Sequence, residues 1–553
     1  MTNNRPSVVN HERNSKLEIY PLPEGIVFER DVSVKMPDGC VLSVNVFRPD
    51  RSGEYPVILS VTPYGKDVGP RGWLVAASAK TTFEMLPEHG SESGFVRVSE
   101  VTSFEAPDPA FWVPAGYVVI VADVRGYFKS RGFPRIFHPK DARDCYELIE
   151  WAARQPWSAG NVGLSGVSYL AISQWYTAAQ RPPHLRAIIP WQGVSDLCRD
   201  VLFHGGIPET KFTRDWMKVM RVGARYPNPM LYPQTLWIGQ RKFFRLVQRL
   251  FPAPDLENID VPALICATWS DQGLHTRGSF EGYSHVKSVN KWLYTHGRKK
   301  WEVFYSEEGV RAQKKFFDFF LKNIANGMLE VPRVRIEVRE TRDKWEARYE
   351  DKWPLRRTRY VDLHLAPHGV LTFDKSTAAA SVSYDSRAHG GVHFDCRWEN
   401  DVELTGNMKL KLWVSAESGR DIDLFVGVQK LDVDGAQVFF EGGVAGFEKD
   451  MVASGWLRIS QRELDPDRSK PWMPYLRHRT KRTIKPGDIV PVEIEVLPSS
   501  TLFRKGETLR LVVQGKDITG NPSIGHKMVV NRGLHHIYLG GHYDSHLLVP
   551  LIE

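Results

Sequence analysis

The chain has 553 residues, of which 42% are hydrophobic and 25% are charged, and its formal net charge is +8. This composition is typical of a globular protein with about two to four domains, and it excludes a disordered or fibrous chain. No run of about eighteen apolar residues is present, and the first residues are polar. We therefore expect a cytoplasmic protein with neither a membrane span nor a secretory signal.

The five cysteines are scattered and have no C-x-x-C spacing, so we expect no disulfide framework, metal site or cofactor. They are Cys40, Cys145, Cys198, Cys266 and Cys396. Basic runs at 298–300 and 477–482 suggest nucleic acid or a membrane surface as alternative partners. No recognition motif accompanies these runs, and solvated loops usually explain them, so we expect neither partner.

From Ile26 to about Asp196, extended hydrophobic runs alternate with helical patterns. Strands are predicted over Pro56–Val61, Tyr117–Ala122 and Arg186–Pro190, and a helix over Asp141–Arg154. This alternation predicts the first part of a doubly wound α/β sheet.

The segment 161–175 reads as a buried strand, a cramped turn with a serine at its apex, and a helix. Gly166 leaves room for a strained turn, Ser168 stands at its apex, and the small Ala171 lets the helix lie close to the sheet. An α/β-hydrolase presents its nucleophile in this way, although Leu170 stands where the strict G-x-S-x-G pattern has glycine. Ser165 is a weaker rival because it lies at the strand end. The N–H of Tyr169, at the helix N-terminus, would form half of an oxyanion hole.

From Leu197 to about Ile259 the pattern changes to helices broken by Pro and Gly and rich in aromatic residues. We interpret this segment as a helical cap inserted over the site. Its aromatic residues either contact an apolar substrate or form the cap's own core. They are Phe203, Phe212, Trp216 and Trp237.

The strand predicted over Val261–Trp269 ends at Asp271, and the next strand, Lys291–Thr295, ends at His296. An acid and a histidine that follow the serine in this order, each after a strand, predict a Ser168–Asp271–His296 triad. Asp255 and Asp260 are weaker acids because they precede the strand, and His275 is a weaker base because it follows the acid so closely. A helix from Val310 to about Ile324 closes this part.

After Val331 short alternating segments replace the helical patterns, which predicts an all-β C-terminal sandwich. The clearest segments are Val334–Val338, Leu410–Val414, Asp423–Val428, Val492–Val496 and Leu509–Val513. Four histidines near the end have no fixed ligand spacing, so strand-end polar residues explain them better than a metal does. They are His535, His536, His542 and His546.

Several motifs together resemble the CocE/NonD family of hydrolases, a group of serine esterases and X-Pro dipeptidyl-peptidases, and the resemblance covers nearly the whole chain. The matching pieces are Thr62–Lys66, Asp123–Gly126 with Ser130–Gly132, Gly166–Leu170, Trp269–Asp271 and Thr295–Gly297, and further matches are Gly455–Ser460 and Ser545–Pro550.

The resemblance implies a jelly-roll C-terminal domain that braces the catalytic domain and completes the pocket. It also implies that the hydroxyl of Tyr64, which follows a buried strand, completes the oxyanion hole with the Tyr169 N–H. The chain departs from the family at Ala171, where glycine is usual, and in the long segment 67–114. We expect that segment to line one wall of the pocket, so substrate choice cannot be carried over.

These observations favour hydrolysis of a carboxylic ester through an acyl-enzyme on Ser168. The alternatives are cleavage of X-Pro peptides or amino-acid amides, or acyl transfer. A peptidase would need carboxylates to bind the substrate's ammonium group, and Glu209, Asp215 and Glu281 are candidates. A non-catalytic binding module would be expected to have lost part of the triad, and none is missing.

Candidate substrate contacts are Trp191, Phe203, Trp216 and Trp269. The expected domains are the α/β-hydrolase domain in two parts, 1–196 and 260–330, the cap at 197–259, and the jelly-roll domain at 331–553. The expected partner is a small ester or amide substrate, and a homodimer stays open.

Overall fold

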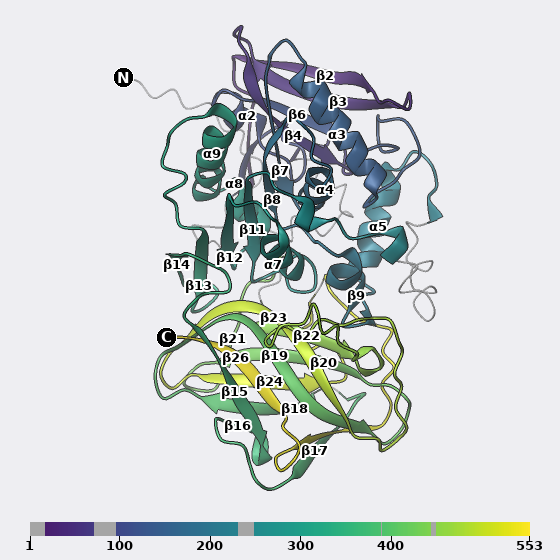
Figure 1. Ribbon diagram of the computed structural model, residues 1–553, viewed down its shortest axis with the longest axis vertical. Coiled ribbons are helices and arrows are strands. Elements are labelled where there is room, and N and C mark those ends of the chain that lie inside the picture. The colour runs from purple at the N-terminus through teal and green to yellow at the C-terminus, as the bar shows by residue number, and fades with distance from the viewer. Residues whose placement is uncertain (1–16, 71–95, 230–247, 389, 444–448, 522) are drawn as a thin grey trace.

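The computed structural model describes residues 17–70, 96–229, 248–388, 390–443, 449–521 and 523–553. An α/β part formed by the N-terminal half lies against a β-rich part formed by the C-terminal half (Figure 1). Within the described ranges, no helix has both the length and the apolar character needed to span a membrane.

The α/β part is organised around one sheet with strand order β2-β3-β6-β4-β7-β8-β11-β12-β13-β14. Strands from β6 to β13 run parallel, and β2, β3 and β14 are antiparallel at the edges. The bounds are β2 Ile26–Lys35, β3 Val41–Pro49, β4 Tyr55–Thr62, β6 Val118–Asp123, β7 Ser158–Val167, β8 Leu185–Trp191, β11 Ala263–Thr268, β12 Lys291–His296, β13 Val334–Arg339 and β14 Trp345–Glu350. The central strands are apolar and buried along their length, as expected for parallel strands covered on both faces.

Helices after the parallel strands cover this sheet. The main ones are α3 Pro139–Ala153, α4 Tyr169–Ala178, α7 Thr276–His285, α8 Lys300–Tyr305 and α9 Glu307–Lys322, and a short helix α2 spans Pro109–Trp112. The predicted strands and helices are confirmed with shifts of one to three residues. Helix α9 begins earlier than predicted because Ser306 Oγ accepts the Gly309 N–H at 3.0 Å and caps it.

The segment between β8 and β11 is less purely helical than the sequence predicts. It contains the π-helical turn η2 Cys198–Leu202, the short strands β9 Phe203–His204 and β10 Ile207–Pro208, helix α5 Phe212–Gly223 and the 3-10 turn η4 Leu256–Asn258. The Glu209 carboxylate accepts the N–H groups of Lys211, Phe212 and Thr213 and so starts α5. The predicted cap residue Trp237 lies outside the described residues.

The C-terminal half is β-rich. Its longest strands are β19 Val402–Ala416 and β23 Val490–Phe503, which extend well beyond the predicted segments Leu410–Val414 and Val492–Val496. One antiparallel group contains β15 Thr358–Ala366, β26 His546–Ile552, β19, β23, β25 Leu534–Leu539 and β17 Ala380–Asp385. A second contains β18 Val392–Arg397, β24 Thr508–Gln514, β20 Asp423–Leu431 and β22 Ala453–Arg458. One hydrophobic core is shared by both groups.

The remaining described elements are short. They are β1 Leu17–Tyr20, which pairs with β5 Val96–Ser99, and β16 Val370–Thr372, β21 Gln437–Val438 and the 3-10 turns η5 Pro367–Gly369 and η6 Ile459–Gln461.

Candidate active site

Ser168 occupies a strained turn between β7 and α4. Its φ of 58° is in the left-handed region, which a non-glycine residue rarely adopts. Gly166 makes this turn possible, since a Cβ there would lie 2.5 Å from Leu170 Cβ. Ala171 packs beside Gly193, where an added Cβ would lie 3.1 Å from Ala171 Cβ. The strain and the close packing hold the Ser168 hydroxyl at the C-terminal edge of the sheet, where functional groups of α/β proteins gather.

His275 is the histidine that contacts Ser168. The distance from Ser168 Oγ to His275 Nε2 is 3.0 Å, and the other ring nitrogen, Nδ1, hydrogen-bonds the carboxylate of Asp271. Asp271 and His275 lie four residues apart on the turn that leads into α7, and the Asp271 carbonyl accepts the His275 N–H at 3.1 Å. Gly273, with a φ of +83°, allows this turn. All three side chains are buried.

The structure does not bring His296, the predicted base, to Ser168. His296 lies at the end of β12, where it is fully buried, and its Nε2 is 2.7 Å from the side-chain amide nitrogen of Gln192. Its Nδ1 accepts the Arg298 N–H at 3.2 Å. Both ring nitrogens are therefore engaged away from Ser168. The physical reason is that His296 packs beside the end of β11, opposite Thr268, whereas the turn that leads into α7 carries His275 to Ser168.

Tyr64 and Tyr169 supply two donors beside Ser168. Burial raises the pKa of Tyr64 well above its usual value, so the phenol stays protonated, and its hydroxyl also lies within hydrogen-bonding reach of Ser168. Trp216 Nε1 donates to the Tyr64 hydroxyl oxygen at 3.2 Å, which leaves the phenol proton free to point elsewhere. Tyr169 is the first residue of α4, where an N–H has no partner within the helix. A developing oxyanion next to Ser168 would therefore find both donors.

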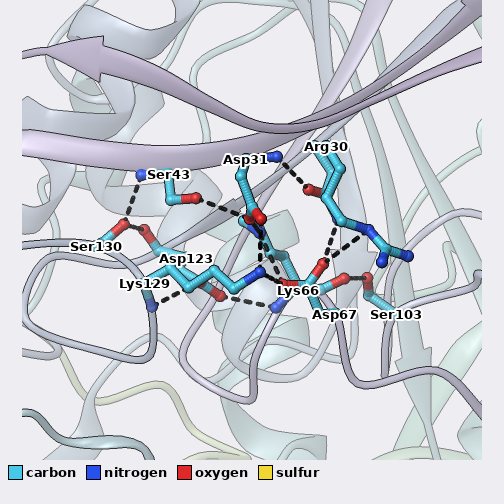
Figure 2. A network of polar contacts seen from close by, with 10 residues as sticks. Arg30, Asp31, Ser43, Lys66, Asp67, Ser103, Asp123, Lys129 and Ser130 are labelled. Atoms are coloured by element: carbon cyan, nitrogen blue, oxygen red, sulfur yellow. Dashed lines mark hydrogen bonds and ion pairs between the residues drawn. The ribbon is translucent and has the colours of Figure 1, made fainter.

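A network of charges surrounds the buried Lys66, two residues after Tyr64 (Figure 2). The Lys66 side chain is fully buried, and its ammonium group donates to Asp31 at 2.5 Å and Asp67 at 2.9 Å. The Lys66 N–H donates to Asp123 Oδ1 at 2.7 Å, and its carbonyl accepts the Ser103 hydroxyl at 2.5 Å. Both the main chain and the side chain of Lys66 are thus fixed two residues after Tyr64.

Lys129 completes this network from the partly exposed side. Its ammonium group lies 2.6 Å from Asp31 and 2.9 Å from Asp67, and its N–H donates to Asp123 Oδ2 at 3.2 Å. Burial raises the pKa of Asp123 to about 6, while the Lys66 and Lys129 N–H groups oppose that shift.

A second buried ion pair flanks the elbow. Glu105 accepts from Lys300 Nζ at 2.9 Å and from Trp301 Nε1 at 3.1 Å, and its carbonyl accepts the Val167 N–H at 3.0 Å. Burial lowers the pKa of His275, Lys300 lowers it further, and Asp271 and Glu105 oppose this shift. A lowered pKa keeps the imidazole neutral near pH 7, which is the form that accepts a proton.

Ser168, His275 and Tyr64 open into a cavity of about 220 Å³. Its walls are mainly apolar and come from α4, η2 and α5 together with the loop before α3. Among the described residues that line the cavity, none is an aspartate or a glutamate, and the cationic side chain is Arg135. The described lining of this cavity is therefore largely apolar.

Of the four predicted substrate contacts, one lines this cavity and three do not. Trp216 lines this cavity, and its indole stacks near Phe137. Phe203 instead lines a separate small cavity of about 40 Å³. Trp191 and Trp269 line neither cavity, because the ring of Trp191 packs against Tyr294 and Phe304 and that of Trp269 against Phe280 and Trp353.

The carboxylates suggested for ammonium binding do not line the cavity. Glu209 accepts the first N–H groups of α5, Asp215 pairs with Arg214 and Lys218, and Glu281 lies beside Arg277 and His285. These partners satisfy the three charges within the described structure.

The long segment 67–114 falls partly outside the described residues, which omit 71–95. Its described part does not line the cavity but supports it from behind, since the ring of Phe104 packs edge-on against Tyr64 with centroids 5.2 Å apart.

The C-terminal half contacts the Asp271 turn, and none of its described residues lines the cavity. The Ser454 N–H donates to Gln272 Oε1 at 2.5 Å, and Gln272 Nε2 donates to the Val452 carbonyl at 3.2 Å. The Gly443 N–H bonds the carbonyl of Ser270, and a Cβ on Gly443 would lie 2.6 Å from Asp271 Cβ. This glycine allows the two halves to meet directly behind the acid.

The sequence analysis ranked His275 below His296 and did not predict the contact between Trp216 and Tyr64. His275 had a usable signal, because a histidine four residues after the acid at a helix start lies on the same turn. Trp216 was named as a substrate contact, but its hydrogen bond to Tyr64 joins residues 152 positions apart and has no local signal.

Comparison with known proteins agrees with this architecture. Residues 38–299 match the X-Pro dipeptidyl-peptidase (S15) family, and residues 326–548 match the X-Pro dipeptidyl-peptidase C-terminal non-catalytic domain. The chain is 24% identical to a cocaine esterase from Rhodococcus sp. (strain MB1 Bresler), over 95% of this chain and 98% of that protein. It is 23% identical to a putative Xaa-Pro dipeptidyl-peptidase from Bacillus anthracis, over 58% of this chain and 56% of that protein.

Among solved structures, a CocE/NonD family hydrolase from Staphylococcus aureus has a TM-score of 0.88 and 41% identity, and the match covers 96% of this chain and 94% of that one. An α-amino acid ester hydrolase shares the fold at a TM-score of 0.66 and 14% identity, with all of both chains covered. The strained serine and the two-part architecture agree with these similarities. Because the similarity extends over nearly the whole chain, the chain belongs to the CocE/NonD family of serine hydrolases.

Proposed function

We propose that this protein is a carboxylesterase in which Ser168, His275 and Asp271 form the catalytic triad. The observation that carries the proposal is the hydrogen-bonded series from Ser168 Oγ through His275 to the Asp271 carboxylate, at the base of an apolar cavity. A hydroxyl is activated as a nucleophile when a neutral imidazole accepts its proton and a buried carboxylate orients that imidazole.

In the proposed reaction His275 Nε2 takes the Ser168 proton as Oγ bonds to the ester carbonyl carbon. The carbonyl oxygen becomes an oxyanion that accepts hydrogen bonds from the Tyr64 hydroxyl and the Tyr169 N–H. His275 then donates its proton to the departing alkoxide, which leaves an acyl group on Ser168. Water attacks this acyl group with His275 again as the base, and the acid product and free serine are released.

The cavity favours esters over X-Pro peptides and amino-acid amides. Those substrates carry an ammonium group, whose recognition in an apolar site calls for a carboxylate. None of the described residues lining the cavity supplies one. The similarity to a putative Xaa-Pro dipeptidyl-peptidase keeps peptide cleavage as the second candidate, and acyl transfer would use the same acyl-enzyme.

We also propose that the segment 197–259 acts as a cap over the cavity, as its described residues Leu202, Trp216, Met217 and Phe251 line the wall. In the same way the β-rich half is proposed to be a jelly-roll domain whose task is to brace the acid turn. Under this proposal the catalytic domain, the cap and the C-terminal domain are divided at residues 196, 259 and 330.

The test compares wild type with Ser168→Ala on p-nitrophenyl esters, X-Pro anilides and amino-acid amides, with kcat/KM measured for each. The expected result is turnover of esters that disappears in the variant. Faster cleavage of anilides or amides would make the protein a peptidase or amidase, and equal activity in the variant would refute the triad.

A further inference from the structure

The rim of the cavity carries a guanidinium group that lacks a counter-charge in contact with it. Arg135 is partly buried and lines the cavity with its neighbours Phe133, Ile136 and Phe137. Within the described ranges of the chain, no residue forms a hydrogen bond or an ion pair with the Arg135 side chain. An arginine in such a position usually has a carboxylate or a phosphate as its partner.

The acidic groups near Arg135 are committed elsewhere. Asp144 is bound by Arg125 through two hydrogen bonds of 2.7 and 2.5 Å. Asp141 accepts the His138 N–H at 3.1 Å, and burial raises its pKa to about 7, so its charge is only partly present at neutral pH. Neither carboxylate lines the cavity. Arg135 acts on both carboxylates without contact, since its charge opposes the rise in their pKa values, and its guanidinium group can still donate hydrogen bonds to a molecule that enters.

His138 adds a donor to the same rim. Its Nδ1 accepts the Lys140 N–H at 3.1 Å, so in the neutral ring the proton is on Nε2. Burial lowers the pKa of His138, and the charges of Arg135 and Lys140 lower it further, so the ring is neutral at pH 7. The rim therefore combines a cation and a neutral N–H donor.

Apolar side chains surround these two polar groups. Phe133 is 46% exposed and Leu250 is 39% exposed, and both line the cavity together with Arg135. Large exposed apolar side chains beside a cation match a ligand that has an apolar body and an anionic end.

On the basis of the proposed esterase function, we propose that Arg135 and His138 bind a carboxylate group of the substrate, so that the preferred substrates are apolar esters that carry one free carboxylate. The carboxylate belongs either to the acyl part, as in a half-ester of a dicarboxylic acid, or to the alcohol part, as in an acylated hydroxybenzoate. A guanidinium binds a carboxylate through two parallel hydrogen bonds, which fixes both position and orientation.

The experiment measures kcat/KM on two matched pairs of esters. Monoethyl adipate is compared with ethyl hexanoate for the acyl side, and 4-butanoyloxybenzoate with its methyl ester for the alcohol side. For one of the two pairs we expect wild type to prefer the charged ester. In Arg135→Met this preference should fall by about ten-fold to a hundred-fold, mainly through KM, because a charged hydrogen-bonded contact is lost.

Two further variants separate this role from a structural one. Arg135→Lys keeps the charge and should retain part of the preference, and the exposed Lys140→Met, which removes a cation outside the cavity lining, should retain all of it. The inference is overturned if wild type has no preference for either charged ester, or if Arg135→Met lowers charged and neutral esters equally.

Binding without turnover keeps this test independent of the proposed reaction. Calorimetry with Ser168→Ala should show 4-butanoyloxybenzoate or monoethyl adipate binding more tightly than its neutral partner, and Arg135→Met in the same background should remove the difference. If wild type hydrolyses no ester but this difference is present, the esterase proposal fails and the anion site stands. If the difference is absent with both pairs, the anion site fails.

Discussion

Substitution of the two buried histidines, His275 and His296, should have different effects on catalysis, and one experiment can test both. Each is changed to glutamine, whose side-chain amide can hydrogen-bond but cannot act as a base near neutral pH. His275 Nε2 is 3.0 Å from Ser168 Oγ, whereas His296 contacts Gln192. Only the His275→Gln variant should lose the activated serine.

The expected magnitudes follow from these contacts. Loss of a general base costs about 10²–10⁴-fold in rate, so His275→Gln should lower kcat by about that factor, or about 3–5 kcal/mol of transition-state stabilisation. His296→Gln should leave kcat within about threefold of wild type. Because it disturbs the buried contacts to Gln192 and Arg298, it should lower the free energy of unfolding by about 1–3 kcal/mol.

The assay pairs steady-state hydrolysis of a p-nitrophenyl ester with urea unfolding of each variant. Unfolding separates loss of chemistry from loss of fold, which matters because both histidines are almost fully buried. If His296→Gln abolished hydrolysis while it stayed folded, and His275→Gln remained active, the triad assigned from the structure would be wrong. The base predicted from the sequence, His296, would then be right.

Three further outcomes follow from the surroundings of the triad. The acid limb of kcat/KM should lie below pH 6.5, because burial lowers the pKa of His275 and activity needs its neutral form. Lys300→Met should shift that limb to higher pH, because the charge of Lys300 lowers the same pKa. Fluorescent ester assays across pH 4–8 measure both effects. Tyr64→Phe should lower kcat by about 10²–10³-fold with little change in KM, which steady-state kinetics measures. Lys66→Met should also lower kcat, but it should have no further effect in the Tyr64→Phe background. As a control, Lys129→Met, on the partly exposed side of the same network, should lower kcat less. Additive losses in the Lys66→Met, Tyr64→Phe double variant would show that Lys66 does not act through Tyr64.

The nucleophile turn and the strands of the sheet could be predicted from sequence because their signals are local. Gly166 is needed for the strained turn, and the apolar runs around it have the length of buried strands, so Ser168 follows from about fifteen consecutive residues. Asp271 follows in the same way from the end of β11. In each case the residues that determine the conformation are neighbours in the chain.

The histidine could not be chosen in this way. Both His275 and His296 lie near the C-terminal edge of the parallel sheet, and a rule about strand ends does not distinguish a ring that turns toward Gln192 from one that turns toward Ser168. Trp191 and Trp269 were misplaced for the same reason. Each lies at or just beyond a strand end, but its side chain points into an aromatic cluster rather than into the cavity.

The position of His275 depends on a turn that the C-terminal half completes. Within the turn, Asp271 and His275 orient each other over four residues, so their pairing needs no distant contact. The position of this turn relative to Ser168 has a different origin, since Gln272 bonds Ser454 and Val452, and Gly443 packs against Asp271. If His275 is the base, the described residues of the β-rich half influence the reaction without lining the cavity, because their contacts position the turn that carries His275 relative to Ser168.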